Sequence, residues 1–223
     1  NESVETYTGK KLPIDFSPLV FGSWMGGDRD GNPNVTAQTT EQVILLSRWE
    51  AANLYEKEFT KIIQHLSLYE CNRKIKKFAG KSQEPYRAYL RPIRNKLKNT
   101  QKHIENYLIE GKKLDEKQLV GSVKEIIEPL NDVYNSLCEA KSKSIADGSV
   151  LDLLRRANSF GINLAKIDIR QEASRHTRLI EKIYKNKNGT KFCDLEESQK
   201  IKFLIKSLKT KNLLIKKNIY SNK

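Results

Sequence analysis

The sequence predicts a mainly α-helical protein that also contains two short strands. Apolar residues recur at helical spacing along most of the 223 residues, and an apolar face of this kind is what a helix buries against a core. Two stretches depart from this spacing. One is a short apolar run that leads into a glycine-rich segment at residues 21–36. The other, residues 162–170, has a period of two, which is typical of a strand.

The first long helix is expected after the glycine-rich segment. Thr36 or Thr39 is suited to cap it, because a threonine side chain at this position accepts a backbone N–H. Its apolar face includes Trp49, which we therefore assign to the core. The other members of this face are Leu45, Ala52, Tyr55, Phe59, Ile62 and Leu66.

Two more long helices follow a polar break around residues 72–82. The second helix is expected from about Pro85 to Gly111, and Pro92 should kink it or delay its start. The third covers residues 116–146 and is interrupted by Pro129. Their apolar faces are Tyr86, Leu90, Ile93, Leu97, Ile104 and Leu108, and Leu119, Val123, Ile126, Leu130, Val133 and Leu137.

The remaining stretches predict shorter elements. Asp194, followed three residues later by Glu197, resembles a capping box. The chain from Thr210 is expected to be a frayed tail. The other predicted elements are, in chain order, an incoming loop over residues 1–18, a short helix capped by Ser149 after Gly148 and ending near Phe160–Gly161, a helix from about Gln171 to Lys185, and a last helix opened by the capping box.

The two predicted strands, residues 19–24 and 162–170, end at residues with distinctive chemistry. Trp24 ends the first strand and Arg170 ends the second. On the second strand Lys166, Asp168 and Arg170 share one side, which suits either solvent or a polar barrel interior. In barrels of alternating strands and helices, functional sites lie at the carboxyl ends of the strands. Trp24 and Arg170 are therefore candidate site residues.

Composition limits the class of protein. Charged residues make up 30% and hydrophobic residues 38%, which suits a soluble globular protein, and no apolar run approaches the ~20 residues that span a bilayer. The three cysteines, Cys71, Cys138 and Cys193, are widely spaced, which predicts reduced thiols in the cytoplasm. The net charge is +14, so nucleic acid has to be considered. However, residues 182–223 hold twelve lysines and no arginine, and aromatic residues do not alternate with the charge, so nucleic-acid binding is disfavoured.

Two stretches of sequence resemble one enzyme family. Residues 21–36 read FGSWMGGDRDGNPNVT, which is similar to the FxSWMGGDRDGNPxVT segment of phosphoenolpyruvate carboxylase. Residues 151–177 resemble the LLDxLRxxxxFGxxLxxxDIRQESxRHT region of the same family, and the intervening Glu84–Pro85–Tyr86–Arg87 also fits. The resemblance covers roughly residues 7–185. It implies that residues 1–223 form a single central segment of a larger chain, an interpretation that also suits the initial Asn1.

The resemblance implies a fold and an activity. The two strands would belong to an incomplete (β/α)8 barrel of the TIM type. Enzymes of this family carboxylate phosphoenolpyruvate with bicarbonate, which gives oxaloacetate and phosphate. This reaction fixes carbon dioxide and replenishes the tricarboxylic acid cycle. It uses Mg²⁺ or Mn²⁺, and family members are typically cytoplasmic homotetramers.

Among the candidate site residues, the resemblance gives roles to Trp24 and Arg170. The tryptophan that matches Trp24 lines an apolar carboxylation pocket, and the arginine that matches Arg170 binds the substrate phosphate. A guanidinium presents a planar fork of donors to phosphate oxygens, and an indole wall excludes water. Without the resemblance, core packing of Trp24 and an ion pair of Arg170 with Asp168 or Glu172 would be the favoured interpretations.

Arg29, Arg175 and His176 are candidates for supporting roles. Arg29 lies between Asp28 and Asp30 and is expected to hold the loop. Arg175 and His176 are expected to brace the start of the helix after Arg170. The family's catalytic histidine belongs to a TAHPTE-like motif and its phosphate loop to an FHGRGG-type motif, and neither occurs in this sequence. We therefore expect no catalytic residue and no metal ligand in this segment, and no turnover by the segment alone.

Two alternatives of other classes remain open from the sequence. One is a non-catalytic basic helical module that binds an anionic ligand or nucleic acid. The other is a scaffold segment whose apolar faces are covered by missing partners.

Overall fold

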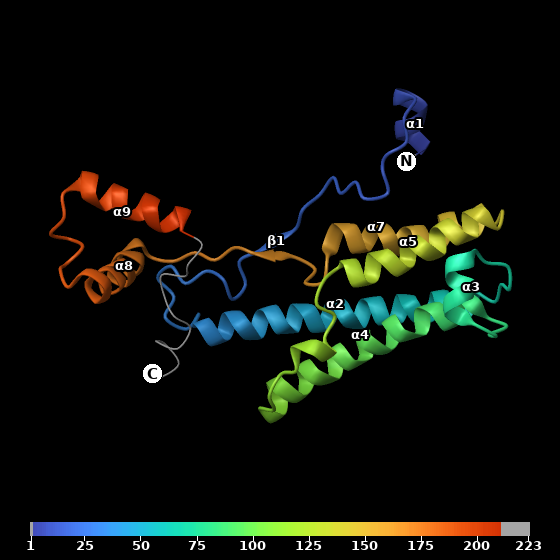
Figure 1. Cartoon of the computed structure of the whole chain (residues 1–223), viewed down its shortest axis with the longest axis horizontal. Coiled ribbons are helices and arrows are strands. Elements are labelled where there is room, and N and C mark those ends of the chain that lie inside the picture. The colour runs from blue at the N-terminus through green and yellow to red at the C-terminus, as the bar shows by residue number, and fades with distance from the viewer. Residues whose placement is uncertain (1, 211–223) are drawn as a thin grey trace. The chain divides into compact units, whose positions relative to one another are not determined.

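The computed structural model describes residues 2–210 and is mainly helical, with two short strands (Figure 1). The strands are short because each joins a sharp turn at one or both ends. The elements, in chain order, are α1 (Glu2–Thr8), β1 (Gly22–Ser23), α2 (Ala37–His65), α3 (Arg73–Ala79), α4 (Pro85–Glu110), the 3-10 turn η1 (Glu116–Gln118), α5 (Lys124–Glu139), α6 (Lys143–Ile145), the π-helical turn η2 (Ala146–Val150), α7 (Leu151–Phe160), β2 (Lys166–Ile167), α8 (Ala173–Asn188) and α9 (Glu197–Lys209).

The chain divides into two compact units. The larger unit contains the chain up to Gly27 together with residues 34–168, and the smaller unit contains residues 28–33 together with the chain from Ile169 onward. The larger unit therefore carries both strands and the helices from α2 to α7. The smaller unit carries α8 and α9.

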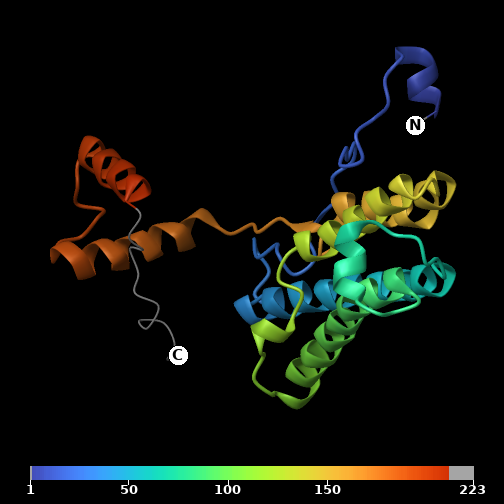
Figure 2. The same ribbon diagram turned by 45° about the vertical axis from the view of Figure 1, so that its right-hand side comes forward.

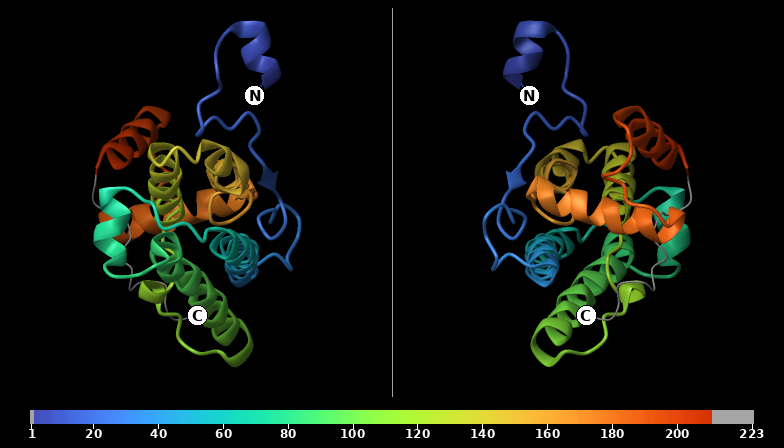
Figure 3. Two further views of the ribbon diagram at one scale, coloured as in Figure 1. Left: turned by 90° about the vertical axis from the view of Figure 1, so that its right-hand side faces the viewer. Right: turned by 90° about the vertical axis from the view of Figure 1, so that its left-hand side faces the viewer.

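The core of the larger unit lies between its long helices. Helix α2 runs beside α4, and α5 lies beside α7, as the views in Figures 1 and 2 agree. In Figure 3 the teal coil of α2 is seen nearly end on, with the green α4 beside it. The shared core is apolar and includes Phe59, Ile62, Tyr86, Leu90, Leu97, Ile126, Leu130, Val133, Leu137 and Leu154, all fully buried.

A second, smaller apolar cluster lies at the other end of α2. Leu45, Ile104 and Leu119 are buried there, and Trp49 packs against them. The indole Nε1 of Trp49 also donates a hydrogen bond to Glu105 at 2.8 Å. The assignment of Trp49 to the core is therefore confirmed.

Helix α2 begins where local sequence signals place it. Thr36 is its cap residue, and its hydroxyl accepts from the backbone N–H of Thr39 at 3.2 Å. The hydroxyl of Thr39 accepts in return from the backbone N–H of Thr36, which completes a capping box. Of the two threonines predicted as caps, Thr36 is the one used.

Helix α4 also has the predicted ends. It begins at Pro85 and ends before Gly111, whose backbone is left-handed. Pro92 lies inside the helix without delaying its start. Proline lacks an N–H and is best tolerated in the first turn, and Pro85 meets that condition.

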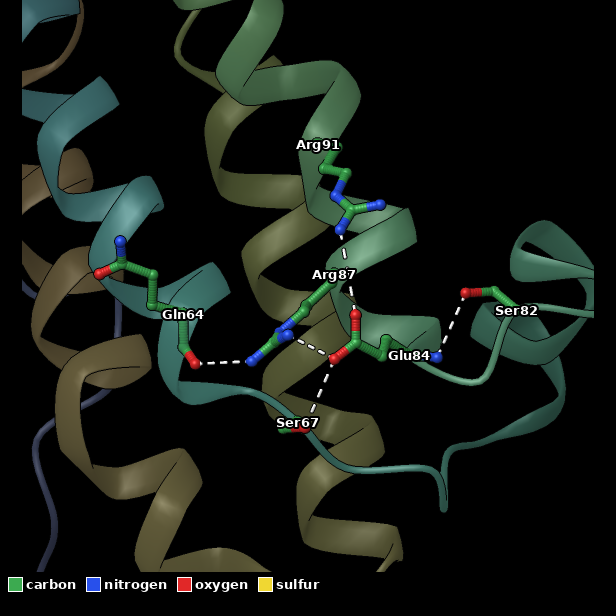
Figure 4. A network of polar contacts seen from close by, with 6 residues as sticks. All are labelled: Gln64, Ser67, Ser82, Glu84, Arg87 and Arg91. Carbon is green, nitrogen blue, oxygen red and sulfur yellow. Dashed lines mark hydrogen bonds and ion pairs between the residues drawn. The ribbon is translucent and has the colours of Figure 1, made fainter.

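A polar network joins the end of α2 to the start of α4 (Figure 4). Arg87 donates to the backbone carbonyl of Gln64 at 2.8 Å and to the carboxylate of Glu84. The same carboxylate accepts from Ser67, and Arg91 lies 3.9 Å from it. The network explains why Glu84 and Arg87 stand on either side of the buried Tyr86 in this sequence.

The two strands pair in parallel, with Gly22 opposite Lys166 and Ser23 opposite Ile167. Both are shorter than the predicted strands 19–24 and 162–170. The chain turns directly after Ser23, and the backbone before β2 contains two left-handed residues, Gly161 and Leu164. Left-handed backbone cannot continue a strand, so β2 begins only at Lys166, in the middle of the predicted stretch.

The smaller unit contains the helices α8 and α9. Helix α8 ends before Gly189, whose backbone is left-handed. Three aromatic rings pack edge to face between the two helices, with centroids 4.9 Å apart for Tyr184 and Phe203 and 5.5 Å apart for Tyr184 and Phe192. This cluster gives the helix pair a small apolar contact of its own.

Several sequence predictions about the helices are wrong. The helix predicted over 116–146 is divided into η1, α5, α6 and part of η2. Extended backbone at Leu119 ends η1, and left-handed Lys141 separates α5 from α6. Pro129 is accommodated inside α5. Residues 1–18 contain helix α1 instead of being a loop throughout, and α3 lies in the expected polar break, capped by Asn72.

Two predicted caps are also wrong. Ser149 lies inside η2, where Gly148 is non-helical, and so it does not cap α7. The capping box of α9 is formed by Glu196 and Gln199, two residues after the one predicted at Asp194. The predicted frayed tail lies, beyond Thr210, outside the described residues. Between residues 2 and 210, no helix combines the length and the apolar character that crossing a membrane requires.

We expect Ser136→Ala in α5 to lower the free energy of unfolding by ~1–3 kcal/mol, which urea denaturation followed by circular dichroism would measure. The buried Ser136 hydroxyl accepts from the backbone N–H of Asn72 at 2.8 Å and lies 2.9 Å from the hydroxyl of Tyr86. Its removal leaves a buried donor without an acceptor. Ser142→Ala is the control and should cost less than about 0.5 kcal/mol. Equal losses in the two variants would contradict this account.

Candidate functional site

Trp24 lies in a tight turn of the larger unit, directly after β1. The backbone N–H of Gly27 donates to the carbonyl of Trp24 at 3.0 Å, and the N–H of Met25 donates to the Ser23 hydroxyl at 3.2 Å. These bonds close the chain on itself within five residues. The turn therefore fixes the backbone from which the indole of Trp24 projects.

Two glycines let this turn lie against its neighbours. A Cβ on Gly27 would lie 2.3 Å from the backbone oxygen of Asp168, just after β2. A Cβ on Gly26 would lie 2.6 Å from Cγ2 of Val43 in α2, and Gly26 has φ +70°. Both positions therefore require glycine, one for its contact with β2 and the other for its contact with α2.

The side chain of Trp24 is exposed, since 64% of the residue is accessible. The alternative that Trp24 is a core residue of the larger unit is therefore wrong. An indole displayed on a rigid turn is available to form one wall of a pocket. Sequence reasoning identified the residue but had no signal for its exposure.

Arg170 contacts the Asp28 loop within the smaller unit. The guanidinium lies 3.7 Å from the Asp28 carboxylate, and the backbone N–H of Arg29 donates to the Arg170 carbonyl at 3.0 Å. The two segments form an isolated parallel bridge at Asp28 and Arg170. The interpretation favoured without the resemblance was an ion pair of Arg170 with Asp168 or Glu172; the structure shows an ion pair with Asp28.

The Arg170 ion pair is weakly held. The Arg170 side chain is 55% exposed and that of Asp28 is 37% exposed. Exposed pairs of this kind contribute about 0–1 kcal/mol, because water and salt screen them. A phosphate group, which accepts two parallel hydrogen bonds from one guanidinium, can therefore compete with Asp28 for Arg170.

The Asp28–Arg29–Asp30 triplet holds its own loop. The N–H of Asp30 donates to the Asp28 carboxylate at 3.2 Å, and Arg29 is bonded through its backbone to Arg170. The structural role expected for this triplet therefore has a basis in Asp28 and in the backbone of Arg29. Sequence reasoning named Arg29 and missed Asp28, because nothing in the sequence marks which carboxylate meets Arg170.

Arg175 and His176 lie in the first turn of α8. The N–H of Arg175 donates to the carbonyl of Glu172 at 3.1 Å, and both side chains are exposed. The Arg175 backbone thus helps to start the helix. No further contact gives either side chain a defined role in the described structure, and their supporting roles remain predictions.

The predicted site residues fall into two groups by unit. Trp24 belongs to the larger unit, and Arg170, Arg29, Arg175 and His176 belong to the smaller one. Within the smaller unit, Arg170 and Arg29 are adjacent through their backbones.

An open pocket of about 720 Å³ in the larger unit lies away from the predicted site residues. Phe21 and Gly22 line it at the start of β1, and Leu164 and Ala165 line it just before β2. It therefore opens at the amino ends of the strands, whereas Trp24 follows the carboxyl end of β1. This pocket is not the predicted site.

The described residues offer no metal centre. Across residues 2–210, no three His, Cys, Asp or Glu side chains lie close enough together to hold an ion. The residues present do not fit the divalent metal that the resemblance implies, so no chemical step here is derived through it.

Comparison with known proteins gives one consistent result. The family model described as phosphoenolpyruvate carboxylase matches residues 1–223. The phosphoenolpyruvate carboxylase of Pectobacterium carotovorum is 42% identical over 217 residues, which is 96% of this chain and 25% of the relative. That of Vibrio vulnificus is 42% identical over 216 residues, 96% of this chain and 24% of the relative. The chain thus spans about a quarter of the length of the curated relatives that it matches, and it belongs to the phosphoenolpyruvate carboxylase family.

Proposed function

We propose that this chain is a central segment of a phosphoenolpyruvate carboxylase, which joins phosphoenolpyruvate and bicarbonate to give oxaloacetate and phosphate. The observation that carries the proposal is the parallel pair β1 and β2, because family-matching motifs continue from both carboxyl ends. The complete enzyme would be a cytoplasmic homotetramer. Its Mg²⁺ or Mn²⁺ would be held by residues outside this segment.

The strand pair supports a barrel as the fold of the complete enzyme. Parallel strands need a crossover connection, and helices α2 to α7 form the connection between β1 and β2. We propose that the two strands are members of an eight-stranded (β/α)8 barrel. Residues that follow the carboxyl ends of such strands are where barrel enzymes place their sites, and Trp24 and Arg170 both meet this condition.

Arg170 would bind the phosphate of phosphoenolpyruvate. Its guanidinium stays charged at any relevant pH and presents paired donors to phosphate oxygens. The exposed contact with Asp28 would orient the side chain before substrate arrives and would be exchanged for the phosphate. Stabilising charge in this way is a main source of acceleration in phosphoryl transfer.

Trp24 would line the pocket in which carboxylation takes place. Bicarbonate attacks phosphorus, which gives carboxyphosphate and the enolate of pyruvate. Carboxyphosphate then releases carbon dioxide, which the enolate carbon captures. Water that reached the enolate would protonate it to pyruvate, and an exposed indole on a rigid turn is suited to exclude that water.

The 223-residue chain alone should be inactive, because the motifs of the catalytic histidine and the glycine-rich loop are absent from its sequence. A coupled assay for oxaloacetate, with phosphoenolpyruvate, bicarbonate and Mg²⁺, should give no turnover. The positive control is a chimaeric enzyme, in which this chain replaces the matching segment of the complete Pectobacterium carotovorum enzyme. This chimaera should be active. Robust turnover by the isolated chain would contradict the prediction.

Arg170→Ala in that chimaeric enzyme should raise the KM for phosphoenolpyruvate about tenfold to a hundredfold, because a charge-assisted bond to phosphate is lost. The KM of Arg170→Lys should lie between those of the unaltered chimaera and of Arg170→Ala, because lysine keeps the positive charge but lacks the planar pair of donors. Arg178→Ala, at an exposed position of α8, is the matched control. Should the chimaera not fold, the same change at the aligned arginine of the Pectobacterium enzyme replaces it. Unchanged kinetics would remove Arg170 from the phosphate site.

Trp24→Ala should change the products more than the binding of substrate. Water would reach the enolate, so the ratio of pyruvate to oxaloacetate formed per phosphate released should rise several-fold. Separate lactate and malate dehydrogenase assays measure the two products. Trp49→Ala is the control, since it disturbs the second apolar cluster and should lower stability without changing the ratio. A constant ratio in Trp24→Ala would refute the role of the indole.

A further inference from the structure

Three hydroxyl groups on α2 bond to backbone carbonyls of distant segments of the larger unit. Thr40 donates to the carbonyl of Gly26 at 2.6 Å, and Tyr55 donates to that of Gly161 at 2.6 Å. Ser47 donates to the carbonyl of Asn163. We call Thr40, Ser47 and Tyr55 the hydroxyl row.

The hydroxyl row lies along one face of α2. At about 100° per residue, the spacings of seven and eight residues place the three side chains within a sector of ~80°. The row extends over roughly 22 Å at 1.5 Å per residue. A single rigid helix can therefore hold both segments in fixed positions relative to each other.

The carbonyls that accept these bonds belong to the Trp24 turn and to the turn before β2. Gly26 is part of the Trp24 turn. Gly161 and Asn163 belong to the turn that leads into β2, whose chain continues to Arg170. The three bonds thus reach the segment after β1 and the segment before β2.

The turn before β2 is strained, and the hydroxyl row holds it. Leu164 has φ +61°, a conformation that side chains other than glycine rarely adopt, and Gly161 has φ +60°. Strained backbone of this kind persists only where its surroundings over-determine it. The hydroxyls of Ser47 and Tyr55 bond on either side of residue 162, directly at this turn.

The buried members of the row are fixed donors. Thr40 and Tyr55 are 5% and 4% exposed, and burial raises the pKa of Tyr55 to about 12. The Tyr55 hydroxyl therefore keeps its proton, and with it the hydrogen bond, throughout the range in which an enzyme works. A hydroxyl has one proton, and for Thr40 the Gly26 carbonyl is closer than the alternative acceptor, Thr36, at 3.2 Å.

We propose that Thr40, Ser47 and Tyr55 are positioning residues, which hold the Trp24 turn and the start of β2 at fixed positions along the axis of α2. The catalytic significance of this placement rests on the proposed function. The three residues touch no reacting atom. They act through the backbone of the Trp24 turn and of the turn before β2.

The test uses hydrogen exchange in the purified chain, measured by NMR at single amides. Thr40→Val should speed exchange of the Gly27 amide, which bonds to Trp24, by about fivefold or more. Ser47→Ala and Tyr55→Phe should do the same for the amides of Lys166 and Asp168, which donate to the carbonyls of Phe21 and Ser23. Each variant should speed exchange only at the amides of the segment to which its hydroxyl bonds, and exchange at the amides of α4 should not change.

Conservative and matched variants separate positioning from general loss of stability. Thr40→Ser and Ser47→Thr keep the hydroxyl and should retain the protection of the wild-type chain. Tyr107→Phe removes a hydroxyl that bonds to Glu41 on α2, at 3.0 Å, and should leave all three amides unchanged. Unchanged exchange at all three amides in the Val, Ala and Phe variants of the row would overturn the proposal, as would equal acceleration throughout the unit.

Activity in the chimaeric enzyme provides a second readout. Loss of a row hydroxyl should lower kcat/KM for phosphoenolpyruvate about fivefold or more, and Thr40→Ser should restore it. If exchange responds as expected but the chimaera has no activity in any form, the proposed function fails while the positioning of the two segments stands. If exchange responds and an active chimaera shows no change in kcat/KM, the catalytic part of the proposal is overturned.

Discussion

The parallel pairing of β1 with β2 is the constraint that the larger unit has to satisfy, because it brings together two segments that lie more than 140 residues apart in the sequence. Only two residues of each strand pair, Gly22 with Lys166 and Ser23 with Ile167, and a sheet this small is not stable alone. The helices between the strands supply the missing stability, because α2, α4, α5 and α7 share one apolar core. The helices that connect the strands therefore hold them in place, and α2 bonds to the segment after β1 and to the segment before β2.

The close approach of backbones explains the density of glycine after Trp24. Gly27 leaves room for the Asp168 carbonyl, and Gly26 leaves room for Val43. Any larger residue at either position would move the turn away from β2 or from α2. The same turn displays an exposed indole, so a closely packed backbone lies directly beside a side chain that is 64% accessible. The backbone of this turn is defined by its two hydrogen bonds and by its close approach to Asp168 and Val43.

The sequence predicted correctly those helix ends that are set by a capping residue, a proline or a glycine at the end itself. Thr36 and Pro85 mark starts, and Gly111 marks an end, because caps and left-handed termini depend on one or a few neighbouring residues. The break at Lys141 could not be predicted, since lysine carries no preference for left-handed backbone and the conformation depends on the packing around it.

The candidate site also combines features that local sequence predicts and features that it does not. Trp24 and Arg170 were found from motifs, but the exposure of Trp24 and the pairing of Arg170 with Asp28 depend on tertiary structure. The three residues of the hydroxyl row could not be predicted for a related reason. The sequence of a helix does not indicate which backbone carbonyl a Thr, Ser or Tyr side chain on it will bond to.

The contact between Asp28 and Arg170 gives a physical reason for an aspartate in the glycine-rich segment. A free arginine samples many rotamers, and ordering it when a ligand binds costs about 2 kcal/mol of side-chain entropy. An exposed carboxylate 3.7 Å away restricts the guanidinium beforehand, yet its own attraction is worth no more than about 1 kcal/mol, so under the proposed function a doubly charged phosphate would displace it. A buried or bidentate partner would hold Arg170 too tightly for this exchange. The backbone bond from Arg29 to the Arg170 carbonyl keeps the two segments together when the side chains part, because it does not involve the guanidinium at all. In the proposed site, Asp28 would therefore orient Arg170 through a side chain that phosphate replaces, while the Arg29 N–H would keep the loop bonded to the Arg170 carbonyl.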